Sequence, residues 1–163
     1  MTSRTPPALL AFALGLLLFT ACNYDGPLTA QPTQPIDRRL LGDWETKDGD
    51  KIEKLLVREL DASSYVLMLD GDLYRAFHSD FAGLPFVSVQ NLKAGTDDRK
   101  YTYVTWRLSA DGRQLVLRAI NPNLIHPPIT TTPAMQRQVS EKIKDPSLLG
   151  EELVYRRPSA AQP

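Results

Sequence analysis

One short stretch of the chain, His78-Ser79-Asp80, contains the three residue types of a hydrolytic triad. Such a triad works only when the histidine ring can reach the serine hydroxyl. The surrounding residues alternate as in a strand, where neighbours point to opposite faces, so His78 and Ser79 are expected to point apart. The chain also lacks the Gly-x-Ser-x-Gly turn that exposes the nucleophile of α/β-hydrolases. We therefore predict that the protein is not an enzyme.

The second histidine, His126, could join His78 and Asp80 in a three-ligand metal site. His78 and Asp80 are two residues apart and can share one face of a strand. Their spacing matches no zinc signature, however, and nothing in the sequence brings His126 near them. We expect His78 to hydrogen-bond Asp80 at a strand end and His126 to lie in a proline-rich loop. No metal or other cofactor is predicted.

Aromatic residues gather around one basic residue between positions 74 and 86. Ligand pockets are mainly apolar with a few polar groups, so this cluster could line a binding site. Aromatic residues are equally common in a filled core. The candidate ligand-lining residues are Tyr74, Arg75, Phe77 and Phe86.

A stiff, proline-rich loop at residues 121–128 leaves Leu124 and Ile125 without obvious partners. Exposed apolar side chains often mark contact sites, so this loop could dock a partner. The same two side chains could instead cover the open end of a sheet. The sequence is compatible with both alternatives.

The only cysteine, Cys22, ends an N-terminal segment of three parts. Residues 1–7 are short and polar with one positive charge, residues 8–19 are apolar, and Thr20 and Ala21 are small. This order predicts a secretory signal peptide over residues 1–21. Its apolar run is too short to span a bilayer as a helix, which takes about 20 residues. A single cysteine also excludes a disulfide within the chain.

The Phe19-Thr20-Ala21-Cys22 sequence resembles a bacterial lipobox, although leucine is usual where Phe19 stands. In that family the cysteine is diacylated on sulfur, the signal is cut before it, and the new amine is acylated. Each buried CH₂ contributes about 0.8 kcal/mol and stable anchoring takes about two acyl chains, so this modification would hold the protein on a membrane. Asn23 replaces the aspartate that retains lipoproteins in the inner membrane. The resemblance thus implies an outer-membrane anchor facing the periplasm.

The 163 residues include 19 basic and 19 acidic side chains, and removal of the signal leaves a net charge of −1. This balance provides no net field that would attract nucleic acid or an anionic membrane surface. The length predicts one folded domain, which we place at residues 37–157. Residues 22–36 contain three prolines and are interpreted as the lipidated cysteine and an extended tether. Residues 158–163 are expected to form a flexible tail.

Seven short β-like runs are separated by turn residues, which is typical of an antiparallel barrel-like meander or a sandwich. The pattern alternates most clearly in residues 101–108 and 114–120, and strands with one solvated face are typical of antiparallel sheets. A helix follows, capped by Thr132 with Pro133 in its first turn. Residues 153–156 resemble a final strand. The seven runs are residues 43–47, 51–60, 65–69, 73–79, 86–91, 101–108 and 115–120.

Gly42-Asp43-Trp44 resembles the Gly-x-Trp start of lipocalin-type barrels. The resemblance implies that Gly42 allows a tight entry into the first strand and that Trp44 plugs one end of the barrel. It also implies a late arginine stacked on the tryptophan, with Arg118 as the first candidate and Arg156 as the second. Two features depart from the family: only seven strands precede the helix, and Thr96-Asp97-Asp98 only partly matches its Thr-Asp-Tyr motif.

The mature domain is also similar to a family of small uncharacterised proteobacterial lipoproteins, chiefly over residues 71–86. Two functions remain open. The barrel could bind a small apolar ligand or lipid, as the lipocalin resemblance implies, and a continuous apolar cavity would favour that function. Alternatively, a core filled by Trp44, Trp106 and the phenylalanines at positions 77, 81 and 86 would favour a structural or interaction lipoprotein that docks an envelope protein.

Overall fold

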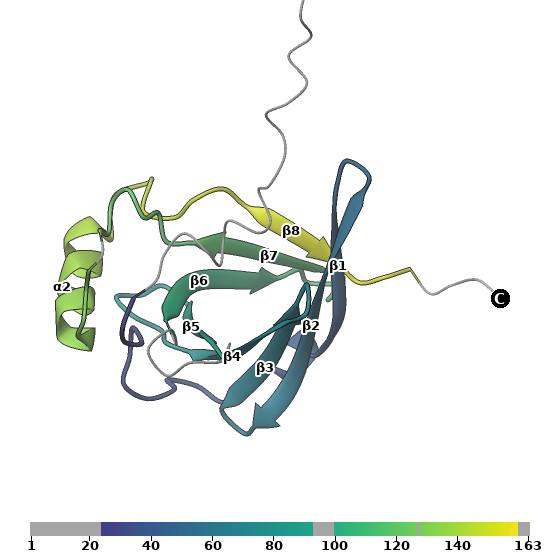
Figure 1. The fold of residues 1–163 in the computed structure, drawn as a ribbon, viewed down its shortest axis with the longest axis horizontal. Helices are drawn as coiled ribbons and strands as arrows, with labels where there is room; N and C mark the ends of the chain where they lie inside the picture. Colours follow the sequence, from purple (N-terminus) through teal and green to yellow (C-terminus); the bar gives the residue numbers. More distant parts are fainter. Residues whose placement is uncertain (1–23, 93–99, 127, 160–163) are drawn as a thin grey trace, which may run out of the picture.

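Eight strands follow the alternating runs of the sequence, and each one hydrogen-bonds to the next along the chain. The eighth pairs back with the first, which closes the sheet into an antiparallel barrel (Figure 1). The computed structural model describes residues 24–92, 100–126 and 128–159. The strands are β1 (Gly42–Asp48), β2 (Lys51–Asp61), β3 (Ser64–Leu69), β4 (Asp72–His78), β5 (Phe86–Asn91), β6 (Tyr101–Leu108), β7 (Gln114–Ala119) and β8 (Leu153–Arg156).

The predicted mainly β barrel with one C-terminal helix is thereby confirmed. A 3₁₀ turn, η1 (Arg38–Leu40), precedes β1, and α2 (Thr132–Lys142) lies between β7 and β8. The strand after the helix is itself the eighth wall strand, between β7 and β1. The predicted signal peptide, Cys22, Asn23 and the Thr96-Asp97-Asp98 motif lie outside the described residues.

Inward side chains from the strands form a single apolar cluster inside the barrel. In β6, Val104 and Trp106 lie on the inward face that the alternation predicts. Leu115 and Leu117 do the same in β7. Removing such surface from water contributes about 25 cal/mol per Å² of apolar area. The large rings in this cluster are Trp44, Tyr65, Tyr74, Trp106 and Tyr155.

A second apolar cluster lies on the outside of the wall formed by β5, β6 and β7. Phe86 in β5, Tyr103 in β6 and Ile120 directly after β7 point outward yet are almost completely buried. The expectation of one polar, solvated face is therefore wrong at these positions. The strands instead need a second layer, because exposed neighbouring apolar side chains would be unfavourable in water.

Part of that second layer comes from the segment that was predicted to be a free tether. Tyr24 exchanges backbone hydrogen bonds with Tyr101 and stacks on Tyr103, with ring centres 5.0 Å apart. Leu28 is fully buried, and its N–H donates to the hydroxyl of Ser88 over 3.1 Å. The extended tether is thus contradicted from Tyr24 onward. The folded unit therefore includes Tyr24 and Leu28, which lie before the predicted boundary at residue 37.

The helix α2 fastens this N-terminal segment to the barrel. Met135 and Val139 are four residues apart, which places them on one face of the helix, and both point into the second cluster. The helix is capped by Thr131 rather than by the predicted Thr132. Thr132 instead donates its hydroxyl proton to the carbonyl of Pro27 over 2.7 Å. Figure 1 shows α2 beside the barrel wall, away from its interior.

The loop around Leu124 and Ile125 covers the sheet instead of offering a docking surface. Ile125 is fully buried, and its carbonyl accepts a hydrogen bond from the hydroxyl of Tyr24 over 2.8 Å. Leu124 packs against the same second cluster. Of the two alternatives for this loop, the structure therefore supports the covering role.

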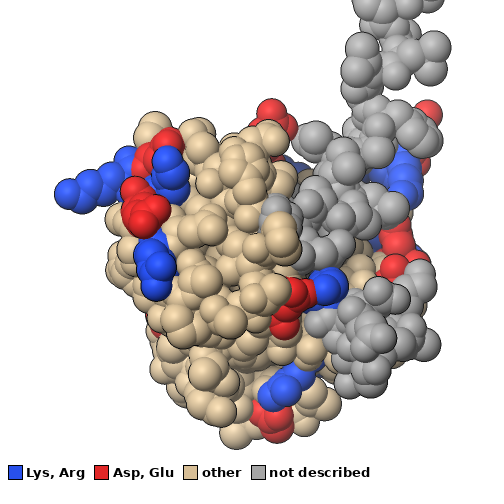
Figure 2. Space-filling model, turned by 60° about the vertical axis from the view of Figure 1, so that its left-hand side comes forward, with Lys and Arg blue, Asp and Glu red and all other residues tan. Residues whose placement is uncertain are grey.

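The surface carries charges of both signs side by side. Figure 2 shows lysine, arginine and acidic side chains interspersed on the face that it brings forward, in keeping with the net charge of zero. Among the described residues, no helix combines the length and apolar character needed to cross a membrane.

Candidate functional site

One end of the barrel is closed by Trp44 beneath η1. The indole is 1% exposed, and its N–H donates to the carbonyl of Leu40 over 2.9 Å. Arg157, immediately after β8, lies over the indole, with its guanidinium carbon 4.2 Å from the ring centre. A cation over an indole face is attracted by the ring quadrupole. Trp44 therefore has both the buried position and the stacked arginine that the Gly-x-Trp resemblance implies.

Gly42 is required by this arrangement for two reasons. Its φ of +132° lies where residues with a Cβ are strained. A Cβ at this position would also collide with the guanidinium of Arg157. The glycine therefore lets the chain enter β1 directly beside the arginine.

The prediction that Arg118 stacks on Trp44 was wrong, as was the second choice, Arg156. Arg118 alternates with inward residues of β7 and points outward, where it donates to the carbonyls of Gly150 and Leu149 over 2.8 and 2.9 Å. Arg156 is exposed at the end of β8. Arg157, the next residue along the chain, is the one that stacks on Trp44.

Arg157 also bridges the weakest seam of the barrel. The ladder between β1 and β8 has a single register pair, Glu45 with Arg156, whereas β1 and β2 share seven pairs. The Arg157 guanidinium donates to the carbonyls of Leu41, on the β1 side, and Arg39 over 3.1 and 2.8 Å. Its third bond, over 3.2 Å, reaches Gly112 in the β6–β7 turn. The Arg157 side chain thus links the start of β1 to the β6–β7 turn across this seam.

The four predicted ligand-lining residues do not converge on one pocket. Tyr74 is part of the barrel interior, whereas Phe86 belongs to the second cluster outside the wall. Arg75 and Phe77 point to the opposite face of β4 from Tyr74, as alternation requires. There the Arg75 guanidinium lies 5.7 Å from the centre of the Phe77 ring and donates to the Ser64 hydroxyl over 3.1 Å. The prediction that they share a ligand site is therefore wrong.

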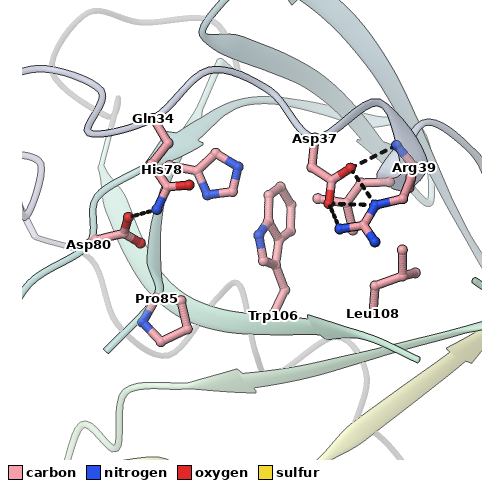
Figure 3. A pocket seen from close by; sticks show the side chains of 9 residues that line it. Gln34, Asp37, Arg39, His78, Asp80, Pro85, Trp106 and Leu108 are labelled. Atoms are coloured by element: carbon pink, nitrogen blue, oxygen red, sulfur yellow. Dashed lines mark hydrogen bonds and ion pairs between the residues drawn. The ribbon is translucent and has the colours of Figure 1, made fainter. Parts of the chain in front are cut away.

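A pocket of about 190 Å³ opens at the Trp44 end, between the segment before β1 and the ends of β4 and β6. Figure 3 shows Trp106 near its centre. His78 and Asp80 lie on one side of the indole, and Asp37 and Arg39 on the other. This volume is below the roughly 300–1,000 Å³ of drug-sized sites. The lining residues are Gln34, Asp37, Arg39, Leu40, His78, Asp80, Pro85, Trp106 and Leu108.

A chain of hydrogen bonds fixes the His78 ring at this pocket. The backbone N–H of Asp37 donates to the Tyr65 hydroxyl oxygen over 2.6 Å, and this hydroxyl lies 3.0 Å from Nε2 of His78. Among the described residues, Nε2 is the one acceptor within hydrogen-bond distance of this hydroxyl, so we place the hydroxyl proton in the bond to Nε2. We therefore assign to His78 the neutral tautomer with its proton on Nδ1.

Burial keeps this pair of side chains neutral. It lowers the pKa of His78 below its ordinary value of 6.5, because the imidazolium would lose its hydration there, and the nearby Asp80 and Asp37 charges oppose this only in part. Burial also raises the pKa of Tyr65 to about 12. The hydroxyl therefore remains a donor, and the imidazole an acceptor, near neutral pH.

The triad and metal interpretations are not supported by the positions of the side chains. Ser79 points away from His78, and its hydroxyl lies 2.8 Å from that of Ser88. Asp80 accepts from Gln34, so the expected His78–Asp80 hydrogen bond is wrong: Tyr65 is the partner of His78 instead. His126 is exposed in its loop. Among the described residues, no three side chains of metal-binding type cluster together.

Sequence reasoning missed the four residues that the chain before β1 contributes to this pocket, Gln34, Asp37, Arg39 and Leu40. Gln34 and Asp37 lie in or directly after a proline-containing stretch whose composition indicates a tether. The stretch does contain Tyr24 and Leu28, two apolar residues that a free tether would expose. They were the available signal that the segment packs on the barrel.

The comparisons with known proteins leave the site to be interpreted from its own geometry. No protein-family model, no curated protein and no solved structure matches the chain.

We predict that Arg157, and not Arg118, is energetically coupled to Trp44. In double-mutant cycles with Trp44→Leu, Arg157→Gln should give a coupling energy of about 0.5–2 kcal/mol, the range of a cation–π contact. Arg118→Gln should be additive with Trp44→Leu within about 0.5 kcal/mol, because the two side chains share no contact. Denaturant titration measures the free energy of unfolding of the wild type, the two single variants and the double variant in each cycle. Equal coupling for both arginines would contradict the assignment.

We also predict that His78 destabilises the fold in mild acid. Its pKa is lower in the folded than in the unfolded state, so the unfolded chain takes up a proton first as the pH falls. Stability should be complete above about pH 6.5 and decrease below it, by at most about 1.4 kcal/mol per pH unit for one proton. Denaturant titrations at a series of pH values measure this slope. His78→Gln should flatten it, and an unchanged slope in that variant would refute the role of His78.

Proposed function

We propose that this chain is a lipid-anchored protein of the bacterial cell envelope whose filled barrel docks an envelope protein partner. The observation that carries the proposal is the packing of the interior. The rings of Trp44, Tyr65 and Trp106 lie in one cluster with the aliphatic side chains of the strands. An apolar ligand or lipid would have to displace these side chains. An interaction role makes no such demand on the core.

The proposed anchor rests on the lipobox-like sequence that ends at Cys22. Tyr24, only two residues later, is held on the barrel by hydrogen bonds to Tyr101. Two residues span at most about 7 Å. A lipid on Cys22 would therefore hold the barrel wall against the membrane surface. The proposed partner must then be a membrane-bound or membrane-proximal protein, on the periplasmic side of the outer membrane.

The surface that best suits such a partner is an apolar row on the outer face of β2, β3 and β4. Leu56 is paired with Met68, and Met68 with Leu73, in the register of the sheet. Met68 is 36% exposed and Leu73 48% exposed. Adjacent exposed apolar side chains are characteristic of protein contact sites. We assign the docking surface to this row.

Cys22→Ser should release the protein from the membrane. The substitution removes the sulfur that would carry the diacylglycerol, and no other anchor is proposed. Membrane fractionation, together with the intact mass of the processed chain, measures both localisation and lipidation. Circular dichroism of the variant should be unchanged, since Cys22 precedes the barrel. A variant that stays in the membrane fraction would refute the anchor.

Met68→Glu and Leu73→Glu should each abolish docking, because a charge in the row would lose its hydration in the interface. Native mass spectrometry of the protein released from its own envelope measures the result. Wild type should carry one protein of defined mass, and both variants should lose it. Leu60→Glu is the matched control, because Leu60 is 52% exposed on β2 outside the row. A retained small molecule in place of a protein would favour the ligand-binding alternative.

A further inference from the structure

The apolar row on the outer face of β2, β3 and β4 is bordered by basic side chains. The three strands are neighbours in the barrel wall (Figure 1). On a strand, the positions two residues before and after a row member share its face. Within the three strands, these positions are Lys54, Arg58, Val66 and Arg75. Three of them are basic and none is acidic, and we call Lys54, Arg58 and Arg75 the basic border.

Arg75 is the member of the basic border whose head group is held in place. Its Nη2 donates to the hydroxyl of Ser64 over 3.1 Å, and its guanidinium carbon lies 5.7 Å from the centre of the Phe77 ring. Ser64 and Phe77 are both buried. Nη1 bonds to no described residue and is not shielded from solvent, whereas Nε is shielded and cannot meet a partner. A guanidinium oriented in advance loses less freedom when Nη1 binds a carboxylate.

No carboxylate of the described residues forms an ion pair with Arg75. Asp61 is the acidic residue whose titration responds to it. The pKa of Asp61 is lowered mainly by hydrogen bonds from Ser63, and least by the charge of Arg75. These bonds, from the Ser63 backbone N–H and hydroxyl, are 2.8 and 3.0 Å long. Asp61 is therefore held by its own turn, and the charge of Arg75 is left beside the row.

The other two members of the basic border differ in how far their charge is balanced. Arg58 lies 2.5 Å from the carboxylate of Asp43. Lys54 is exposed and faces Glu45 across the β1–β2 ladder without an ion-pair contact. Positive charge thus remains on both sides of the row, which favours an acidic partner. A second copy of this chain is disfavoured, because a two-fold interface on the row would contain two basic borders, and like charges repel.

We propose that the partner docked on this row is a protein segment in which acidic residues flank apolar side chains. The apolar side chains pack on Leu56, Met68 and Leu73. One carboxylate accepts a hydrogen bond from Nη1 of Arg75, and a second lies near Lys54. This inference rests on the proposed docking function and adds the chemistry of the partner. Affinity should fall as salt is added, because attraction between exposed charges is screened.

The test uses the full-length protein and the partner that native mass spectrometry finds on it, followed by a binding titration of the two purified components. Arg75→Gln should weaken binding at least about tenfold, as the loss of a charge-assisted hydrogen bond requires. Lys54→Gln, at an exposed position, should weaken it about two- to fivefold. Arg137→Gln, on α2 away from the row, is the matched control and should leave binding unchanged. Near-ultraviolet circular dichroism checks the packing of each variant.

A charge exchange gives the sharpest result. Arg75→Glu should abolish binding to the wild-type partner. Replacement of one acidic residue of the partner by arginine should restore binding to Arg75→Glu and weaken binding to the wild-type chain.

Undiminished binding by Arg75→Gln or Lys54→Gln, with binding still lost in Leu73→Glu, would overturn this inference and leave the docking function intact. A wild-type chain that retains no protein would overturn both. Retention of a second copy of the chain would overturn the acidic partner. So would binding of the Cys22→Ser variant to phosphatidylglycerol vesicles that is lost on Arg75→Gln, because the row would then face a membrane.

Discussion

The barrel depends on the contact between Arg157 and Trp44. A closed barrel avoids exposed strand edges only if its first and last strands meet. Here that seam has a single register pair, so the backbone ladder contributes little to closure. Arg157 lies on the indole and donates to carbonyls on the β1 side and in the β6–β7 turn. The same contact explains the glycine at position 42, since a side chain there would occupy the place of the guanidinium.

The second constraint is the burial of apolar side chains on both faces of one wall. The interior cluster packs inside the barrel, while Tyr103 and Ile120 point outward and need a cover of their own. That cover consists of α2, the loop with Ile125 and the N-terminal segment from Tyr24 onward. The segment is therefore part of the fold, and it carries Gln34 and Asp37 to the end of the barrel.

These two constraints meet at the small pocket. Its inner side is formed by strand residues, His78 and Trp106, and its outer side by the segment that leads into η1. The Asp37 backbone N–H reaches Tyr65 and through it orients His78, so the state of the imidazole depends on the docked segment. Burial lowers the pKa of His78, which leaves Nδ1–H as a donor toward the pocket near neutral pH. At this end of the molecule, the packing of the N-terminal segment therefore determines how His78 is hydrogen-bonded.

The sequence by itself determined the local features: the strands, the helix near residue 133 and the opposed directions of His78 and Ser79, because alternation and turn residues act over a few positions. It also allowed Trp44 to be singled out. Only the tertiary structure decided which arginine stacks on it, because Arg118 and Arg157 differ in strand face and in position relative to the closing seam. The same is true of the N-terminal segment: Tyr24 and Leu28 are buried only because β5 and β6 offer an apolar outer face. Such contacts join residues that are far apart in the chain, so composition and local patterns do not predict them.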